Sequence, residues 1–233
     1  MPARPTVLLF DIDGTLVSTG GAGRRAIERA FATLHGGDGA LAFSLGGMTD
    51  RGIVRSGLRE RGLGDDDAAI DAVLERYLSL LEEEVRAAEV YFAHPGVVAM
   101  LDRAEVSARA RPLAIGLGTG NIARGSQIKL ERVDLWRRFA FGGFGSDDED
   151  RATILRIGAE RGARHLGVPL ERCRVVAIGD TPRDIAAAHA SGARCVAIAT
   201  GSYSTAALAD AGADDVFETL AHSGAAEAVL GEV

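Results

Sequence analysis

The amino-acid sequence predicts an α/β protein with a doubly wound, Rossmann-like parallel-sheet core and a small, all-helical second domain. Short apolar runs alternate with helical patterns along most of the chain, which is typical of βαβ units. Residues 18–94 break this alternation, because they hold helical patterns and no convincing strand. We therefore predict a core formed by residues 1–17 and 95–233, with residues 18–94 as a helical domain inserted between the first two strands.

The predicted strands are short apolar runs, most of which end at glycine, aspartate or another turn residue. They lie at residues 6–10, 112–117, 140–143, 174–178, 194–198 and 214–217. Helical patterns separate the later strands. They lie at residues 151–165, 184–191 and 205–211. Gly192 and Gly212 end the last two of these helices at positions where a C-cap glycine is expected.

The inserted region contains three predicted helices, at residues 24–34, 50–61 and 65–88. The third has apolar side chains at helical spacing, which indicates one buried face. They are Ile70, Val73, Leu74, Tyr77, Leu78 and Leu81. The insert should lie above the sheet, joined to the core at residues 16–19 and 91–95.

Composition excludes several classes of function. The chain of 233 residues is 47% hydrophobic and 25% charged, with a net charge of -7, so broad affinity for nucleic acid or anionic membranes is not expected. No apolar run approaches the roughly 20 residues that span a bilayer. Cys173 and Cys195 make no disulfide framework, and the first residues do not resemble a signal peptide, so a cytoplasmic protein is expected. Monomer and homodimer are both compatible with this sequence.

The most informative segment is Asp-Ile-Asp-Gly-Thr at residues 11–15. It follows an apolar strand directly, so Asp11 and Asp13 are expected at the carboxyl end of the sheet, where open α/β folds bind ligands. Gly14 permits the backbone to turn there. Two carboxylates this close repel each other unless a cation or a shared proton relieves them. The pair therefore predicts a metal site.

Three further polar clusters follow predicted strands. They are the segments Gly-Thr-Gly-Asn at 118–121, Arg151 after an acidic turn, and Gly-Asp-Thr-Pro-Arg-Asp at 179–184. Because the carboxyl ends of parallel strands share one edge of a sheet, these clusters should converge with Asp11 and Asp13.

Together the four clusters resemble the motifs of the haloacid dehalogenase-like hydrolase superfamily, in its phosphatase branch. Residues 11–15 resemble the first motif, Thr119 the second, Arg151 the third, and Asp180 with Asp184 the fourth. The resemblance covers the whole chain, and the helical insert is similar to the family's alpha-helical cap of the first type. It implies a Mg²⁺-dependent phosphatase that acts on a small phosphorylated metabolite.

The resemblance also implies a role for each residue. Asp11 would attack phosphorus and form an aspartyl-phosphate, and Asp13 would protonate the leaving oxygen and later activate water. Thr119 and the Gly120 N–H would bind the phosphoryl oxygens, and Arg151 would offset their charge.

The implied Mg²⁺ ligands are the carboxylates of Asp11 and Asp180 and the backbone carbonyl of Asp13, with Asp184 orienting metal-bound water. Asp184 also suits the first turn of a helix, where the dipole favours an acid. Asn121 is either a substrate-binding residue or the cap of the next helix.

The third motif departs from the family pattern, because relatives usually carry lysine where this chain has Arg151 followed by Ala152. Lys129, the only lysine, is the competitor. It lies about eight residues into the helix after Thr119, which at 1.5 Å per residue is roughly 12 Å down a helix expected to run away from the site. We therefore predict Arg151 as the third-motif cation and Lys129 as a solvated charge on a helix face.

Other reactions of the superfamily fit less well. Dehalogenation needs no acid at position 13, because chloride leaves unprotonated, so Asp13 favours phosphoryl transfer. Phosphonate cleavage in the family uses a cap lysine, and the predicted cap has none. A sugar phosphomutase and a non-catalytic phosphate-binding domain remain as alternatives.

Substrate identity should depend on the cap. Arg24 is positioned to meet an anionic leaving group, and Thr49 lies in a glycine-rich segment that suits a substrate loop or a helix cap. With Arg51 and Arg55 the cap is rich in arginine, which suits a small acidic phosphate such as phosphoglycolate, and equally a nucleotide or sugar phosphate.

Overall fold

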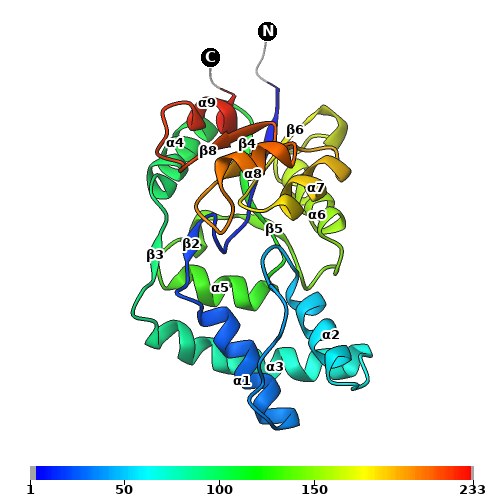
Figure 1. Cartoon of the computed structure of the whole chain (residues 1–233). Coiled ribbons are helices and arrows are strands. Elements are labelled where there is room, and N and C mark those ends of the chain that lie inside the picture. Colours follow the sequence, from blue (N-terminus) through cyan, green and yellow to red (C-terminus); the bar gives the residue numbers. More distant parts are fainter. Residues whose placement is uncertain (1–3, 232–233) are drawn as a thin grey trace.

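The computed structural model describes residues 4–231 and contains a six-stranded parallel sheet with the order β5-β4-β1-β6-β7-β8 (Figure 1). The strands are β1 (Thr6–Phe10), β4 (Leu113–Thr119), β5 (Phe141–Phe144), β6 (Arg174–Gly179), β7 (Arg194–Ile198) and β8 (Asp215–Phe217). Each lies within two residues of its predicted bounds. The predicted α/β class is therefore confirmed.

β1 lies in the centre of the sheet, because it pairs with β4 on one side and with β6 on the other. The chain order reverses at this point, and a crevice at the carboxyl ends of the strands is the usual ligand site of such sheets. Successive residues of β1 point to opposite faces, so Leu8 and Phe10 join one apolar cluster while Val7 and Leu9 join another.

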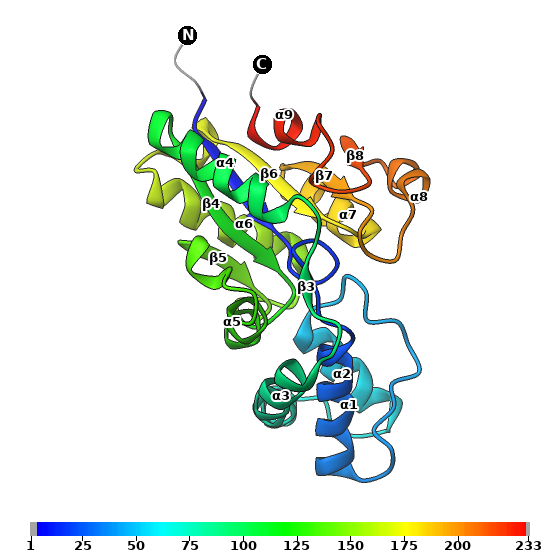
Figure 2. The same ribbon diagram turned by 90° about the vertical axis from the view of Figure 1, so that its left-hand side faces the viewer.

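Helices cover both faces of the sheet (Figure 2). The face of Leu8 packs against α4 (Val97–Ala110) and α9 (Ala225–Leu230). The face of Leu9 packs against α6 (Arg151–His165), α7 (Pro182–Ala190) and α8 (Thr205–Asp210). α6 has its predicted bounds, whereas α4 and α9 were not predicted.

The helices of the insert are α1 (Ala22–His35), α2 (Asp50–Glu60) and α3 (Asp67–Ala87). We call these three helices and their connections the cap; it forms an apolar cluster of its own at one end of the core (Figure 1). Two short strands, β2 (Val17–Ser18) and β3 (Phe92–Ala93), pair antiparallel where the chain enters and leaves the cap. They coincide with the predicted joints.

α5 (Ala123–Glu131) occupies an unusual place, since it follows β4 but lies between the sheet and the cap (Figures 1 and 2). Ile122 and Ile128 belong to the apolar cluster of the cap, whereas Leu130, near the end of α5, belongs to a cluster of the sheet. α5 therefore runs past the carboxyl edge of the sheet instead of covering one of its faces.

Within residues 4–231, no helix combines the length and the hydropathy that crossing a bilayer requires.

Candidate active site

A cluster of three buried carboxylates lies at the carboxyl edge of the sheet. Asp11 follows β1 directly, Asp180 follows β6, and Asp184 lies in the first turn of α7. Each offers an oxygen atom, and these atoms lie within 4.8 Å of one another. All three side chains belong to residues that the sequence assigned to one site, and the parallel sheet brings them together as expected.

The environment of these acids suits a cation. Burial raises the pKa of Asp11 to about 6, an effect that Arg151 partly offsets and the neighbouring Asp184 increases. Burial, together with Asp184 and Asp11, raises the pKa of Asp180 to about 8. Three acidic side chains held this close repel one another when ionised, and a divalent cation with oxygen ligands relieves that repulsion. The donor set therefore fits Mg²⁺.

The turn after β1 needs glycine. Gly14 has a φ of 81°, and a side chain built there would collide with the carboxylate of Asp180. Thr15, the next residue, donates a hydrogen bond from Oγ1 to Asp180 Oδ1 at 3.1 Å. The segment that carries Asp11 thus also positions the acid that follows β6.

Arg151 enters the same site from the N-terminus of α6, where Asp150 caps the helix. Its Nη2 lies 3.4 Å from Asp11 Oδ2 and also contacts Asp184 Oδ1. The side chain is 12% exposed. Arg151 is therefore placed to bind an anion that approaches Asp11.

Lys129 also lies in the site, so its predicted role as a solvated surface charge is wrong. The residue is 3% exposed, and its Nζ lies 2.6 Å from Asp13 Oδ2 and 2.6 Å from Asn121 Oδ1. The distance argument failed because α5 lies along the edge of the sheet rather than down its face. A helix that covers a sheet face would have carried Lys129 away.

This ammonium group sets the charge of Asp13. Burial raises the pKa of Asp13, but the charge of Lys129 and hydrogen bonds with Lys129, Asn121 and Thr19 together outweigh burial, so the net pKa is below its ordinary value. Burial alone would lower the pKa of Lys129, but Asp13 and Asp50 raise it above its ordinary value. Both members of the pair are therefore charged.

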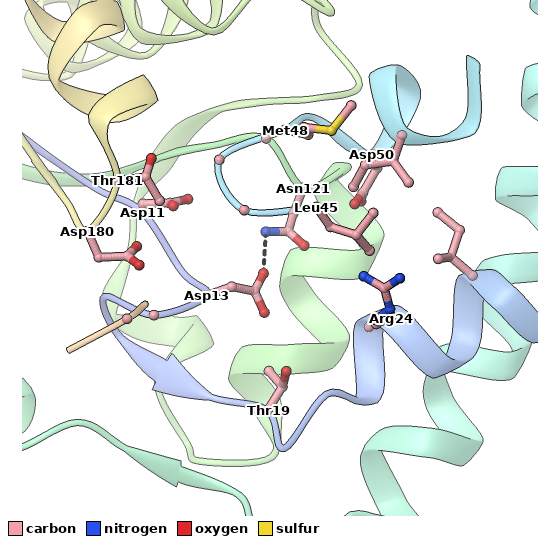
Figure 3. Close-up of a pocket in the computed structure, with 18 of the residues that line it drawn as sticks. Asp11, Asp13, Thr19, Arg24, Leu45, Met48, Asp50, Asn121, Asp180 and Thr181 are labelled. Atoms are coloured by element: carbon pink, nitrogen blue, oxygen red, sulfur yellow. Dashed lines mark hydrogen bonds between the residues drawn. The ribbon is translucent and has the colours of Figure 1, made fainter. Parts of the chain in front are cut away.

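Asn121 takes part in the site rather than in helix capping, because the N-cap position of α5 is Ile122. Its Nδ2 donates to Asp13 Oδ2 at 2.9 Å, as Figure 3 shows, and to Thr119 Oγ1 at 2.9 Å. Thr119 is buried and forms a hydrogen bond with Asp11. Gly120 follows Thr119 and lines a cavity between the sheet edge and the cap.

Asp184 has the position in the first turn of a helix that the sequence predicts, and it also belongs to the acidic cluster. It forms a capping box with Thr181, which begins α7. Its Oδ1 also contacts Arg151 and its carboxylate belongs to the acidic cluster. The helix cap holds this acid in place beside Asp11 and Asp180.

The cap residues proposed to bind substrate are otherwise engaged. Thr49 Oγ1 caps α2 by accepting from Gly52 N at 3.1 Å and donates to Glu149 O at 3.2 Å, and Thr49 does not line the cavity. Arg24 lines the cavity, but its Nε binds Glu28 and its other two nitrogens bind backbone carbonyls.

Arg51 and Arg55 lie outside the cavity lining and form ion pairs. Arg51 is paired with Asp67 and Asp71, and Arg55 with Glu149 and Asp65. Arg51 and Arg55 thus connect parts of the cap to one another and to the core, whereas Arg24 lies in the cavity lining.

Two cavity residues were missed by the sequence analysis as site residues. Asp50 joins α2 to the core, because its N donates to Gly120 O at 2.8 Å and its Oδ2 accepts from Ile122 N at 2.9 Å. Tyr77 lies on α3 with its hydroxyl buried. In the sequence Asp50 is only the first residue of a predicted helix, and Tyr77 is one of several apolar side chains at helical spacing, so no local pattern marks either as a site residue.

The site residues enclose a cavity of about 280 Å³ between the sheet edge and the cap (Figure 3). From the core it is lined by Asp11, Asp13, Gly120, Asn121, Lys129, Arg151 and Asp180. From the cap it is lined by Arg24, Ile27, Leu45, Asp50, Ile53 and Tyr77, among others. Asp11, at the end of β1, and Asp180 of the acidic cluster therefore line the same cavity as Asp13 and Arg151.

Comparison with known proteins gives a consistent family assignment. A family model described as haloacid dehalogenase-like hydrolase matches residues 8–189, and a second, HAD-hydrolase-like, matches residues 156–223. No curated protein sequence matches this chain significantly.

Solved structures share the fold over nearly the whole chain. A hydrolase from Pseudomonas syringae has a TM-score of 0.68 and 21% identity, with 94% of this chain and 95% of that chain covered. CbbY from Rhodobacter sphaeroides in complex with phosphate has a TM-score of 0.69 and 19% identity, covering 94% and 96%. A predicted phosphoglycolate phosphatase from Haemophilus somnus has a TM-score of 0.65 and 17% identity, covering 94% and 96%. With its four motifs gathered around one cavity and a family model matched over most of its length, the chain belongs to the haloacid dehalogenase-like hydrolase family.

Proposed function

We propose that this protein is a Mg²⁺-dependent phosphatase that hydrolyses a small phosphate monoester through an aspartyl-phosphate on Asp11. The observation that carries the proposal is the position of Asp11. Its carboxylate lies beside the acids of a cation site and 3.4 Å from Arg151, and it faces the same cavity as Asp13. This arrangement has the nucleophile, the charge neutralisation and the proton carrier that phosphoryl transfer requires.

In the first step an oxygen of Asp11 forms a bond to phosphorus, and the bond from phosphorus to the ester oxygen breaks. Arg151 and the hydroxyl of Thr119 hold the phosphoryl oxygens as their charge redistributes. Asp13 is ionised in the free site, so it first takes up a proton from the substrate's phosphate monoanion or from solvent, and it then gives this proton to the departing oxygen. Because Lys129 lowers the pKa of Asp13, the protonated form of Asp13 is a stronger acid than an ordinary carboxyl group.

In the second step a water molecule attacks phosphorus, and the bond from phosphorus to Asp11 breaks. Asp13, now ionised, accepts the proton of the water. The pair with Lys129 stabilises this ionised form, so Asp13 is ready to act as the base. Asp11 returns to its carboxylate form and inorganic phosphate leaves.

The cation would be held by the carboxylates of Asp11 and Asp180 and by the backbone carbonyl of Asp13, with Asp184 beside them. When bound, Mg²⁺ supplies positive charge that allows an anionic nucleophile to approach a phosphate dianion. Thr15 and Gly14 keep Asp180 in position for this role.

Similar structures support the proposal. CbbY from Rhodobacter sphaeroides was solved with phosphate and with xylulose-1,5-bisphosphate, and two similar structures are described as predicted or putative phosphoglycolate phosphatases. The cavity of about 280 Å³ suits an ester of this size class.

The test is a panel of phosphate esters assayed with Mg²⁺ for released inorganic phosphate, using the natural chain and Asp11→Asn. We expect turnover by the natural chain, none without a divalent cation, and none by Asp11→Asn. Metal-independent turnover, or activity retained by Asp11→Asn, would contradict the proposal. Isomerisation of a sugar phosphate that needs a sugar bisphosphate and releases no inorganic phosphate would contradict it in favour of a phosphomutase.

A further inference from the structure

We propose that Tyr77 Oη and Lys129 Nζ form a subsite for an uncharged oxygen, a hydroxyl or a carbonyl, on the leaving group of the substrate. The preferred substrates would then be monophosphates of small polyols rather than phosphates of hydroxy acids. This inference rests on the proposed phosphatase function and specifies its substrate class.

The first observation is an unsatisfied hydroxyl group. Tyr77 is 1% exposed, and its hydroxyl has no hydrogen-bond partner among the described residues, yet the residue lines the cavity. A buried hydroxyl without a partner costs about 1–3 kcal/mol, so native proteins rarely leave one unpaired. Burial raises the pKa of Tyr77 well above its ordinary value, so the hydroxyl stays protonated and can donate.

The second observation is that this hydroxyl lies close to Lys129. Gly23 lies in α1 and lines the same cavity as Tyr77 and Lys129. A Cβ atom on Gly23 would lie 3.2 Å from Lys129 Nζ and 3.9 Å from Tyr77 Oη, so both polar groups lie near the same point of α1. A ligand oxygen that reaches the cavity wall between the two groups can meet both.

One hydrogen of the Lys129 ammonium group is available to a ligand. Its ammonium group has three hydrogens, and hydrogen bonds to Asp13 and Asn121 occupy two of them. The third hydrogen and the Tyr77 hydroxyl are both donors, so together they favour an acceptor oxygen. The carbon skeleton that carries such an oxygen would lie against Ile27 and Ile53, which line the same cavity.

Charge decides between a neutral and an anionic oxygen. Each basic side chain among the described lining residues is already paired: Arg24 with Glu28, Lys129 with Asp13, and Arg151 with Asp11 and Asp184. Asp13 and Asp50 also face this cavity (Figure 3). A carboxylate on the leaving group would therefore meet two acids and no unpaired cation, whereas a hydroxyl or carbonyl would not be repelled.

The inference is tested by measuring kcat/KM for glycerol phosphate, phosphoglycolate and phenyl phosphate with the natural chain, Tyr77→Phe and Gly23→Ala. Phenyl phosphate has no second oxygen on its leaving group, so it reports on the chemical step alone. We expect glycerol phosphate to exceed phosphoglycolate at least tenfold. Tyr77→Phe should lower kcat/KM for glycerol phosphate about tenfold, which corresponds to about 1.4 kcal/mol, with little change for phenyl phosphate.

Gly23→Ala narrows the space beside Tyr77 and Lys129 and should show the same selective loss. Its melting temperature is measured alongside, because the new methyl group lies 3.2 Å from Lys129 Nζ. Matched controls are Gly64→Ala, where nothing lies within 4 Å of the new atom, and Tyr203→Phe, whose ring is exposed and outside the cavity lining.

Two outcomes would overturn the inference while leaving the phosphatase proposal intact. One is a preference for phosphoglycolate by the natural chain. The other is an equal loss on glycerol phosphate and phenyl phosphate in Tyr77→Phe and Gly23→Ala. Absence of phenyl phosphate hydrolysis by the natural chain would instead count against the phosphatase function itself.

Discussion

At the scale of single residues, the charged partner of each carboxylate in the cavity determines its protonation state. Asp13 is kept ionised by an ammonium group 2.6 Å away. Asp11 and Asp180 lack such a partner of comparable effect, and burial raises their pKa values to about 6 and about 8. Asp13 is therefore suited to proton transfer, and Asp11 and Asp180 are suited to hold a cation.

Replacing Asp180 with asparagine should raise the stability of the metal-free protein and remove its stabilisation by Mg²⁺. The folded pKa of Asp180 lies above its ordinary value of 3.8, so its contribution to stability is complete below that pH and is lost as the pH rises towards 8. We expect metal-free Asp180→Asn to be more stable than the natural chain at pH 8, because one repelling charge is removed.

The same variant should not gain stability from Mg²⁺. For the natural chain, Mg²⁺ at 100 times its dissociation constant should add about 2.7 kcal/mol. Thermal unfolding with EDTA and with Mg²⁺ measures both effects, and Asp210→Asn on the exposed side of α8 is the control. An undiminished response of Asp180→Asn to Mg²⁺ would exclude Asp180 as a ligand.

Several site residues could be predicted from the sequence, whereas their contacts across the chain could not. Asp11, Asp180 and Arg151 follow strands or begin helices, and the ends of parallel strands share one edge of the sheet. The bonds of Lys129 and Asp50 depend on where α5 and the cap lie, and no local pattern reports that. The estimate that placed Lys129 roughly 12 Å from the site assumed that its helix covers a face of the sheet.

At the scale of elements, the N-terminus of α2 connects the cap to the core. Asp50 bonds to the backbone on both sides of Asn121, through Gly120 O and Ile122 N. Burial raises the pKa of Asp50 to about 6, and Lys129 partly offsets this effect. Ionisation of Asp50 therefore lowers the stability of the folded protein, although Asp50 connects the cap to the sheet edge.

This contact predicts a measurable pH dependence. The folded pKa of Asp50 exceeds 3.8, so stability from this residue is complete below pH 3.8 and is lost as the pH rises through about 6. The loss is on the order of 3 kcal/mol. Asp50→Asn keeps the acceptor for Ile122 N but cannot ionise. We therefore expect the free energy of unfolding to fall less between pH 4 and 7 in Asp50→Asn than in the natural chain.

Denaturant unfolding across this pH range, without added metal, measures the difference. Glu75→Gln, an exposed site on α3, should follow the natural chain. Parallel curves for Asp50→Asn and the natural chain would show that Asp50 does not titrate in this range.

Element boundaries were predictable where two signals agreed. β1 and α6 have their predicted bounds, because an apolar run ends at a motif in one case and an acidic turn precedes an arginine-rich helix in the other. α4 and α9 were not predicted, and β2 and β3 are too short to leave a pattern of their own. β2 and β3 form only because residues 17–18 pair with residues 92–93, which are far away in the sequence.

At the scale of the whole molecule, the cap lies beyond the carboxyl edge of the sheet (Figure 2), and residues of both line the cavity. The two parts are joined by the β2–β3 pair and by contacts such as Arg55 with Glu149, at 3.0 Å. Cap and core must therefore be together for the complete site to exist.

The enclosed volume predicts a limit on substrate size. A cavity of about 280 Å³ accepts a phosphate group with a small leaving group but not a peptide. We expect kcat/KM for a phosphoserine peptide to be on the order of 100-fold or more below that for glycerol phosphate, because the peptide cannot place its phosphate next to Asp11. Comparable kcat/KM values for the peptide and for glycerol phosphate would contradict a size limit set by this cavity.

The central claim is that Asp11 becomes phosphorylated during turnover. The most direct measurement is rapid acid quenching of the natural chain during hydrolysis of a phosphate ester with Mg²⁺, followed by peptide mass spectrometry. The account predicts one added phosphoryl group on the peptide that contains Asp11, and none in Asp11→Asn. A phosphoryl group on another residue, or active turnover with no modified peptide at any quench time, would contradict it.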